Sequence, residues 1–183
     1  MGAVSTVLAQ QPKAELPPID WGAIAPILVI LGAAVVGVVI EAFVPRRLRW
    51  TTQVGLSLLA IVGAGAALAA YARTRTDDVT TMAKTLAIDS PSLFLWGTLL
   101  ALGLAALLLM ADRSIEPGGA FVAEQGGNDM RTEVFPLALF SLGGMMVFCA
   151  ANDLLTMFIA LEVLSLPLYL LCGLAKRRRR MSQ

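Results

Sequence analysis

Five long apolar stretches, separated by polar segments, dominate the pattern of the sequence. Each holds about 18 to 24 residues, close to the ~20 that an α-helix needs to cross the ~30 Å hydrocarbon core of a membrane. We therefore expect an all-α, polytopic integral membrane protein with five transmembrane helices. The predicted spans are residues 21–44, 53–71, 92–111, 134–151 and 153–174.

The polar segments predict the orientation of these helices. Residues 1–20 are polar and contain prolines. We interpret them as a periplasmic N-terminal lead, a segment outside the membrane that precedes the first helix. The 45–50 connection carries three Arg, and the basic tail at 175–183 carries one Lys and four Arg. Basic residues are retained on the cytoplasmic side, and both segments fall on one side if five spans alternate. The N-terminus is then outside and the tail cytoplasmic, as expected for a multi-pass membrane protein.

The amino-acid composition is typical of a membrane protein and limits which metal-binding and proton-transfer groups the chain can contain. The 183 residues are 57% hydrophobic and 15% charged, whereas soluble domains are about 25% charged. The sequence has no His and only two Cys, so no metal cluster or imidazole proton relay is expected. The basic tail is interpreted as a determinant of topology, with the lipid bilayer as its neighbour and no nucleic acid as a partner.

One carboxylate, Glu162, lies near the middle of the fifth apolar stretch. Counted along the helix, it is roughly 13 Å from one end of the span and roughly 18 Å from the other. An ionisable group at that depth costs at least ~2.5 kcal/mol and is by default a candidate functional residue.

The residues after Glu162 extend this candidate site. Ser165 and Tyr169 follow at i+3 and i+7, so they share its helical face. Pro167 has no N–H and therefore leaves the carbonyl of Val163 without its helical partner. These groups predict a short polar track through an apolar helix. The alternative is that Glu162 only hydrogen-bonds a neighbouring helix and stabilises the bundle.

Two further carboxylates adjoin the predicted spans. Glu41 lies near the cytoplasmic end of the first span, and we interpret it as an interfacial carboxylate close to Arg46 or Arg47, with proton access as the alternative. Asp153 begins the fifth helix. A carboxylate there can cap the helix and interact favourably with the N-terminal end of its dipole.

Residues 133–174 resemble a family of known membrane proteins. The matching features are Asn152-Asp153 in the turn, Leu161-Glu162, and the run Ser165 to Tyr169 (Ser-Leu-Pro-Leu-Tyr). This pattern is similar to subunit N of the bacterial proton-pumping NADH:quinone oxidoreductase, respiratory complex I. The sibling antiporter-like subunits place Trp before the glutamate, and this chain has Leu161.

The resemblance implies a role in proton translocation coupled to electron transfer. The family's fifth-helix glutamate pairs with a lysine on a later helix, and Glu162 takes that place here. Moving such a partner changes how tightly both groups hold their protons. The resemblance implies no redox cofactor in this chain, with flavin, iron–sulfur clusters and quinone in other subunits. The chain would act in an enzyme only as a non-redox part of the complex, with other membrane-arm subunits as partners.

The resemblance covers only the N-terminal third of a family member, which has about fourteen transmembrane helices. No lysine lies within any predicted span of this sequence. The chain is therefore either a piece of a longer antiporter-like subunit or a degenerate subunit that remains as a scaffold. The alternatives to a role in proton translocation are a structural or assembly subunit that does not pump, and a cation/proton antiporter module.

Overall fold

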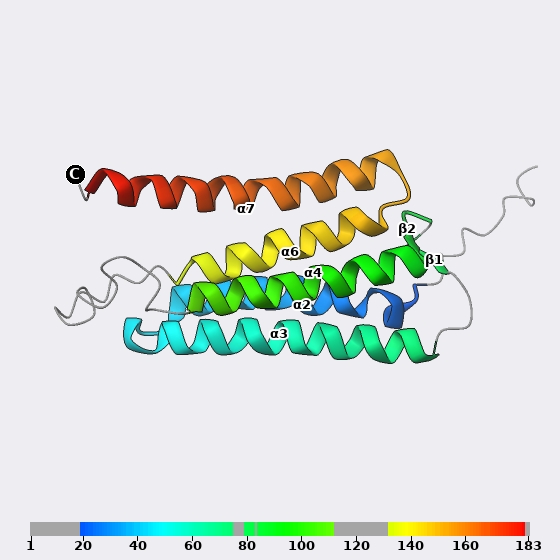
Figure 1. Ribbon diagram of the computed structural model, residues 1–183, viewed down its shortest axis with the longest axis horizontal. Coiled ribbons are helices and arrows are strands. Elements are labelled where there is room, and N and C mark those ends of the chain that lie inside the picture. Colours follow the sequence, from blue (N-terminus) through cyan, green and yellow to red (C-terminus); the bar gives the residue numbers. More distant parts are fainter. Residues whose placement is uncertain (1–18, 75–78, 83, 112–131, 182–183) are drawn as a thin grey trace, which may run out of the picture.

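The structure is a computed structural model that describes residues 19–74, 79–82, 84–111 and 132–181. Most of the predicted N-terminal lead and most of the connection before the fourth span lie outside these residues. The elements in chain order are α2 (Trp21–Phe43), α3 (Arg46–Thr74), β1 (Val79–Thr81), β2 (Leu86–Ile88), α4 (Ser90–Ala111), α6 (Val134–Ala150) and α7 (Leu154–Met181). The helices run side by side along one axis, with the two strands at one end (Figure 1).

The helical architecture predicted from the apolar pattern is confirmed within the described ranges. Four of the five helices there are long and apolar enough to cross a membrane. The fifth, α6, has 17 residues, a length of about 25 Å. Helix α3 begins at Arg46, before the predicted start at residue 53, because Pro45 ends the preceding turn and no helix breaker follows it.

A small β-hairpin lies between α3 and α4, in a polar segment of a chain that the apolar pattern predicted to be all-α. Strands β1 and β2 pair antiparallel, with Val79 opposite Ile88. The connection between them turns through Met82 and Lys84, which both have positive φ angles. The hairpin also contacts the start of α2, because the backbone N–H of Asp20 donates to Thr81 Oγ1 at 3.1 Å.

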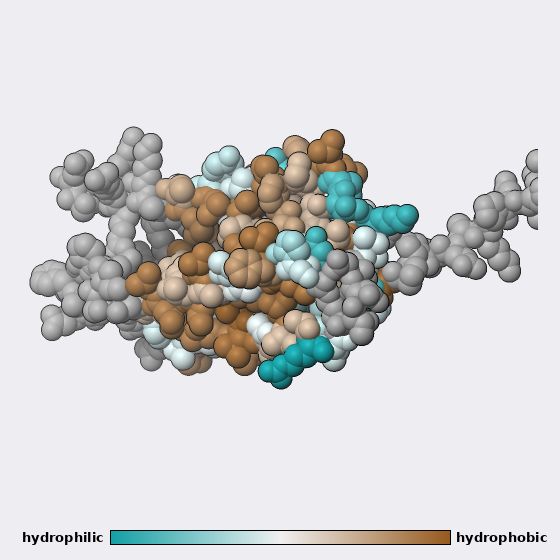
Figure 2. All heavy atoms as spheres, turned by 45° about the vertical axis from the view of Figure 1, so that its right-hand side comes forward, coloured by the Kyte–Doolittle hydropathy of each residue, from teal (hydrophilic) through white to brown (hydrophobic). Residues whose placement is uncertain are grey.

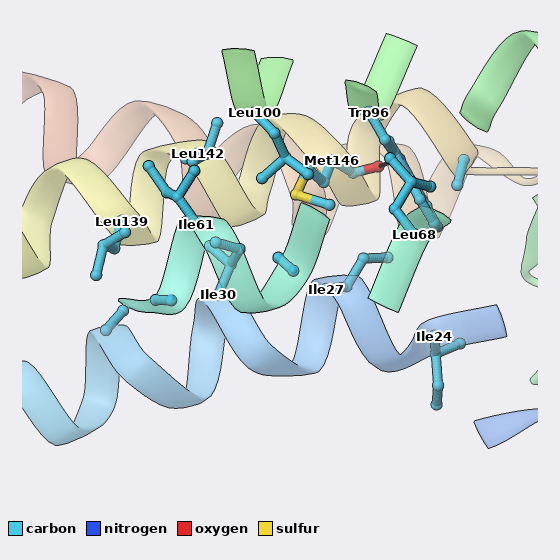
Figure 3. Packing of buried hydrophobic residues seen from close by; sticks show 14 of the residues in the cluster. Ile24, Ile27, Ile30, Ile61, Leu68, Trp96, Leu100, Leu139, Leu142 and Met146 are labelled. Atoms are coloured by element: carbon cyan, nitrogen blue, oxygen red, sulfur yellow. Dashed lines mark hydrogen bonds between the residues drawn. The ribbon is translucent and has the colours of Figure 1, made fainter. Parts of the chain in front are cut away.

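Helix α6 lies at the centre of the packing. It contacts α2, α3, α4 and α7, and also β2. Buried side chains of α2, α3, α4 and α6 meet in one apolar cluster (Figure 3). Trp96 of α4 is fully buried there, and its indole N–H donates to the carbonyl oxygen of Met146 at 2.8 Å. The position of α6 therefore fixes how the other helices are arranged.

The outer surface of the bundle is strongly apolar. Large hydrophobic side chains are exposed on all five helices; examples are Val35, Leu59, Phe94, Phe148 and Leu155. Figure 2 shows one face, where hydrophobic residues cover the middle and hydrophilic residues gather toward one end. Such a surface suits the hydrocarbon region of a membrane, where the backbone hydrogen bonds of helices are satisfied internally.

Candidate functional site

Glu162 lies in the apolar part of α7, which extends over Leu154–Gly173. Counted along the helix axis, it is about 12 Å from the start of this segment and about 17 Å from its end. Its side chain is partly buried. Among the described residues, none donates a hydrogen bond or forms an ion pair with this carboxylate.

The polar residues predicted to accompany Glu162 share its helix but are not joined to it. Ser165 is partly buried, whereas the Tyr169 side chain is 70% exposed. Pro167 lies inside α7 and is buried. Within the described ranges, no hydrogen bond connects Glu162, Ser165 and Tyr169. The three side chains therefore form a set on one helix rather than a continuous hydrogen-bonded chain.

Directly after Glu162, the backbone of α7 lies against the backbone of α6. The Ser141 hydroxyl donates to the carbonyl oxygen of Leu164 at 3.3 Å. A Cβ atom built on Gly144 would lie 2.6 Å from the Leu164 nitrogen and 3.0 Å from the Val163 carbonyl carbon. This contact was not predicted from the sequence, although the Gly143-Gly144 pair in an apolar helix is a signal of close helix packing.

The start of α7 is fixed by a cap, as predicted for Asp153. Its carboxylate accepts the backbone N–H of Thr156 at 2.8 Å and the Thr156 hydroxyl at 2.7 Å. These hydrogen bonds to the charged form lower the pKa of Asp153 below its ordinary value. The preceding Asn152 donates its backbone N–H to Thr85 O and its side-chain amide to Lys84 O, both at 2.8 Å. The turn before α7 is therefore tied to the β-hairpin.

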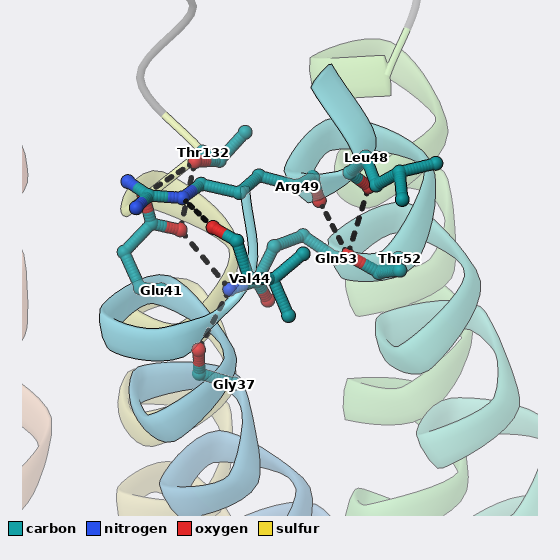
Figure 4. A network of polar contacts seen from close by, with 8 residues as sticks. All are labelled: Gly37, Glu41, Val44, Leu48, Arg49, Thr52, Gln53 and Thr132. Atoms are coloured by element: carbon teal, nitrogen blue, oxygen red, sulfur yellow. Dashed lines mark hydrogen bonds and ion pairs between the residues drawn. The ribbon is translucent and has the colours of Figure 1, made fainter. Parts of the chain in front are cut away.

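Glu41 is the centre of a polar network at the opposite end of the bundle (Figure 4). Arg49 Nη1 lies 3.2 Å from Glu41 Oε1, and Gln53 Nε2 lies 3.2 Å from Oε2. The Thr132 hydroxyl is 2.7 Å from both carboxylate oxygens. The network joins α2 and α3 to Thr132, which lies two residues before α6.

Glu41 has partners that the sequence did not predict, and its predicted closeness to Arg46 or Arg47 stays a prediction. Arg49 pairs with it, while the side chains of Arg46 and Arg47 lie outside the described residues. Gln53 and Thr132 were not anticipated, because their contacts depend on how the helices turn and pack. Glu41 thus contacts three donors, whereas Glu162 has none in the described part of the chain.

Glu162 is not part of a cluster of possible metal ligands among the described residues. Within the described ranges, no group of three or more His, Cys, Asp or Glu side chains could hold a metal ion. The chemistry of the site is that of one carboxylate in mid-span, close to a helix contact made through the backbone. These features define a polytopic helical membrane protein with an ionisable group inside its apolar layer.

Comparison with known proteins shows which membrane proteins this chain is similar to. No family model matches the chain. The chain is 67% identical, over 93% of its length, to NADH-quinone oxidoreductase subunit N of Saccharopolyspora erythraea. It is 52% identical over 92% of its length to the subunit N of Salinispora arenicola, and 43% identical over its full length to that of Rhodococcus opacus.

These relatives confirm the resemblance found in the sequence: the chain is homologous to the N-terminal part of NADH-quinone oxidoreductase subunit N. It spans 36%, 35% and 39% of the length of these three relatives.

Proposed function

We propose that this chain forms the N-terminal transmembrane part of a complex I subunit N and that Glu162 takes part in proton translocation. The observation that carries the proposal is the position of Glu162: partly buried, mid-span in α7, and without a partner among the described residues. A charged group left in that position is costly unless water or an opposite charge reaches it. The proposed role in proton translocation requires water or an opposite charge beside Glu162.

The same reasoning indicates which kind of group would be the partner of Glu162. A carboxylate that faces a lysine from a later helix gains the opposite charge that the described residues do not offer, and the resemblance to subunit N implies this pair. The protein would lie in the bacterial inner membrane beside other membrane-arm subunits, with its N-terminus outside and the end of α7 cytoplasmic. The basic residues of the 45–50 connection and of the tail support that orientation.

The test is Glu162→Gln, introduced into the complete subunit within the assembled complex. Inverted membrane vesicles then report NADH oxidation and proton uptake in the same preparation. We expect the complex to assemble and proton uptake per NADH oxidised to fall at least tenfold. Glu133→Gln is the matched control, because Glu133 is exposed and makes no side-chain capping bond. It should leave both activities unchanged.

Two other outcomes would favour the alternative functions. Normal proton uptake in Glu162→Gln, with or without less assembled complex, would favour a structural role for this helix. Proton movement that requires sodium and continues without NADH would favour a cation/proton antiporter module. Both outcomes contradict the proposed role of Glu162.

A further inference from the structure

We propose that Gly144 of α6 is a positioning residue for Glu162 of α7. Because Gly144 has no side chain, the two helices touch through their backbones, and this contact sets where the glutamate lies. The inference deepens the proposed function and rests on it, since it assumes that Glu162 exchanges protons.

The obstacle that a side chain at Gly144 would meet is main chain. An ideal Cβ at this position lies 2.6 Å from the Leu164 nitrogen, 2.9 Å from its Cα and 3.0 Å from the Val163 carbonyl carbon. Ordinary contacts of a Cβ atom begin at 3.4 Å. An added methyl group therefore requires α7 to move away or bend by about 0.8 Å.

The movement would be transmitted to Glu162. Val163 follows Glu162 directly, so their Cα atoms are about 3.8 Å apart and move together. Pro167 donates no N–H to the Val163 carbonyl, which weakens the internal hydrogen bonding of α7 at this turn. The helix depends here on its contact with α6, which includes the 3.3 Å hydrogen bond from Ser141 to Leu164 O.

The adjacent glycine provides a matched control on the same helix. A Cβ atom on Gly143 would meet the side chain of Leu31 on α2, at its Cδ2 atom and, at 2.8 Å, at its Cγ atom. Both atoms belong to a side chain, and a change of the Leu31 χ1 rotamer moves both of them. Gly143→Ala thus adds the same methyl group one residue away, against α2 instead of α7.

The experiment compares Gly144→Ala, Gly143→Ala and Glu162→Gln in the complete, assembled complex. Inverted vesicles report NADH oxidation, proton uptake per NADH, and the pH dependence of proton uptake. A displacement near 1 Å can cost a positioned group up to about 100-fold in rate. We expect Gly144→Ala to lower proton uptake per NADH about tenfold and to move its pH profile by half a unit or more. Gly143→Ala should keep the wild-type profile.

Ser141→Ala keeps the inference testable if Gly144→Ala fails to assemble. It removes the hydrogen bond to Leu164 O without adding volume, and we expect a two- to threefold loss of proton uptake with the same direction of pH shift. A pH profile identical to wild type in Ser141→Ala and in any assembled Gly144→Ala would overturn the inference. If Glu162→Gln pumps normally, the proposed function fails instead, and the positioning role falls with it.

Discussion

Glu41→Gln tests whether the polar network at the end of α2 holds three segments together. The substitution keeps the shape of the side chain but removes its charge and one of its two acceptor oxygens. Arg49 and Gln53 of α3 and Thr132 before α6 all approach this carboxylate within 3.2 Å. The Arg49 and Glu41 side chains are only 26% and 17% exposed, so water replaces these bonds poorly.

The loss of stability expected for Glu41→Gln follows from the number of hydrogen-bond donors that contact the carboxylate. A hydrogen bond to a charged group contributes about 1.5–3 kcal/mol. Arg49 keeps its second bond, from Nε to Val44 O at 2.6 Å, and Gln53 keeps its bond to Gly37 O at 2.7 Å. We therefore expect Glu41→Gln to lower the free energy of unfolding by about 2 kcal/mol. Thr132→Val should cost about 1 kcal/mol, because its hydroxyl has one proton to share between the two carboxylate oxygens.

The assay is a double-mutant cycle of Glu41→Gln and Thr132→Val. Unfolding of the complete subunit in mixed micelles gives the four free energies, and we expect a coupling of about 1 kcal/mol. Thr52→Val is the control for the loss of a hydroxyl, because among the described residues the Thr52 hydroxyl donates only to carbonyl oxygens of its own helix. It should change stability by less than about 0.5 kcal/mol.

Additive effects would refute this reasoning. A coupling below about 0.3 kcal/mol means that the two side chains act independently, and that Glu41 does not fix the start of α6.

Two smaller predictions concern α4 and α7. Trp96→Phe should lower the free energy of unfolding by about 2 kcal/mol, because it removes the 2.8 Å hydrogen bond to Met146 O and leaves a cavity. The control is Trp21→Phe, which should change the free energy of unfolding little, because Trp21 is 66% exposed. Asp153→Ala should lower the melting temperature at pH 7, and the gap to wild type should close as the pH falls below about 4. The lowered pKa of Asp153 means that its stabilisation is present above the unfolded-state value of 3.8 and is lost as the folded group takes up a proton.

The apolar pattern was sufficient to predict the helices and the place of Glu162 within the apolar part of its helix. Long apolar runs leave few choices, because helices satisfy their own backbone hydrogen bonds in a membrane. The cap by Asp153 was also predictable, since it depends on residue type and on a contact three positions along the chain.

Contacts between helices were much harder to predict. Helix α6 is apolar on every side, so its sequence does not tell which face meets which neighbour. Gly143 and Gly144 are adjacent, yet one faces α2 and the other faces α7. The hairpin was missed for a related reason: its strands have three residues each, and the contacts that hold them come from distant residues such as Asn152.

The most direct test of the central claim is whether Glu162 changes its protonation during turnover. Infrared difference spectroscopy of the complete complex detects the C=O stretch of a carboxyl group that gains or loses a proton. We predict a carboxyl band that appears on addition of NADH, shifts in D2O, disappears in Glu162→Gln and remains in Glu133→Gln. Identical difference spectra for wild type and Glu162→Gln would contradict the claim that Glu162 carries protons.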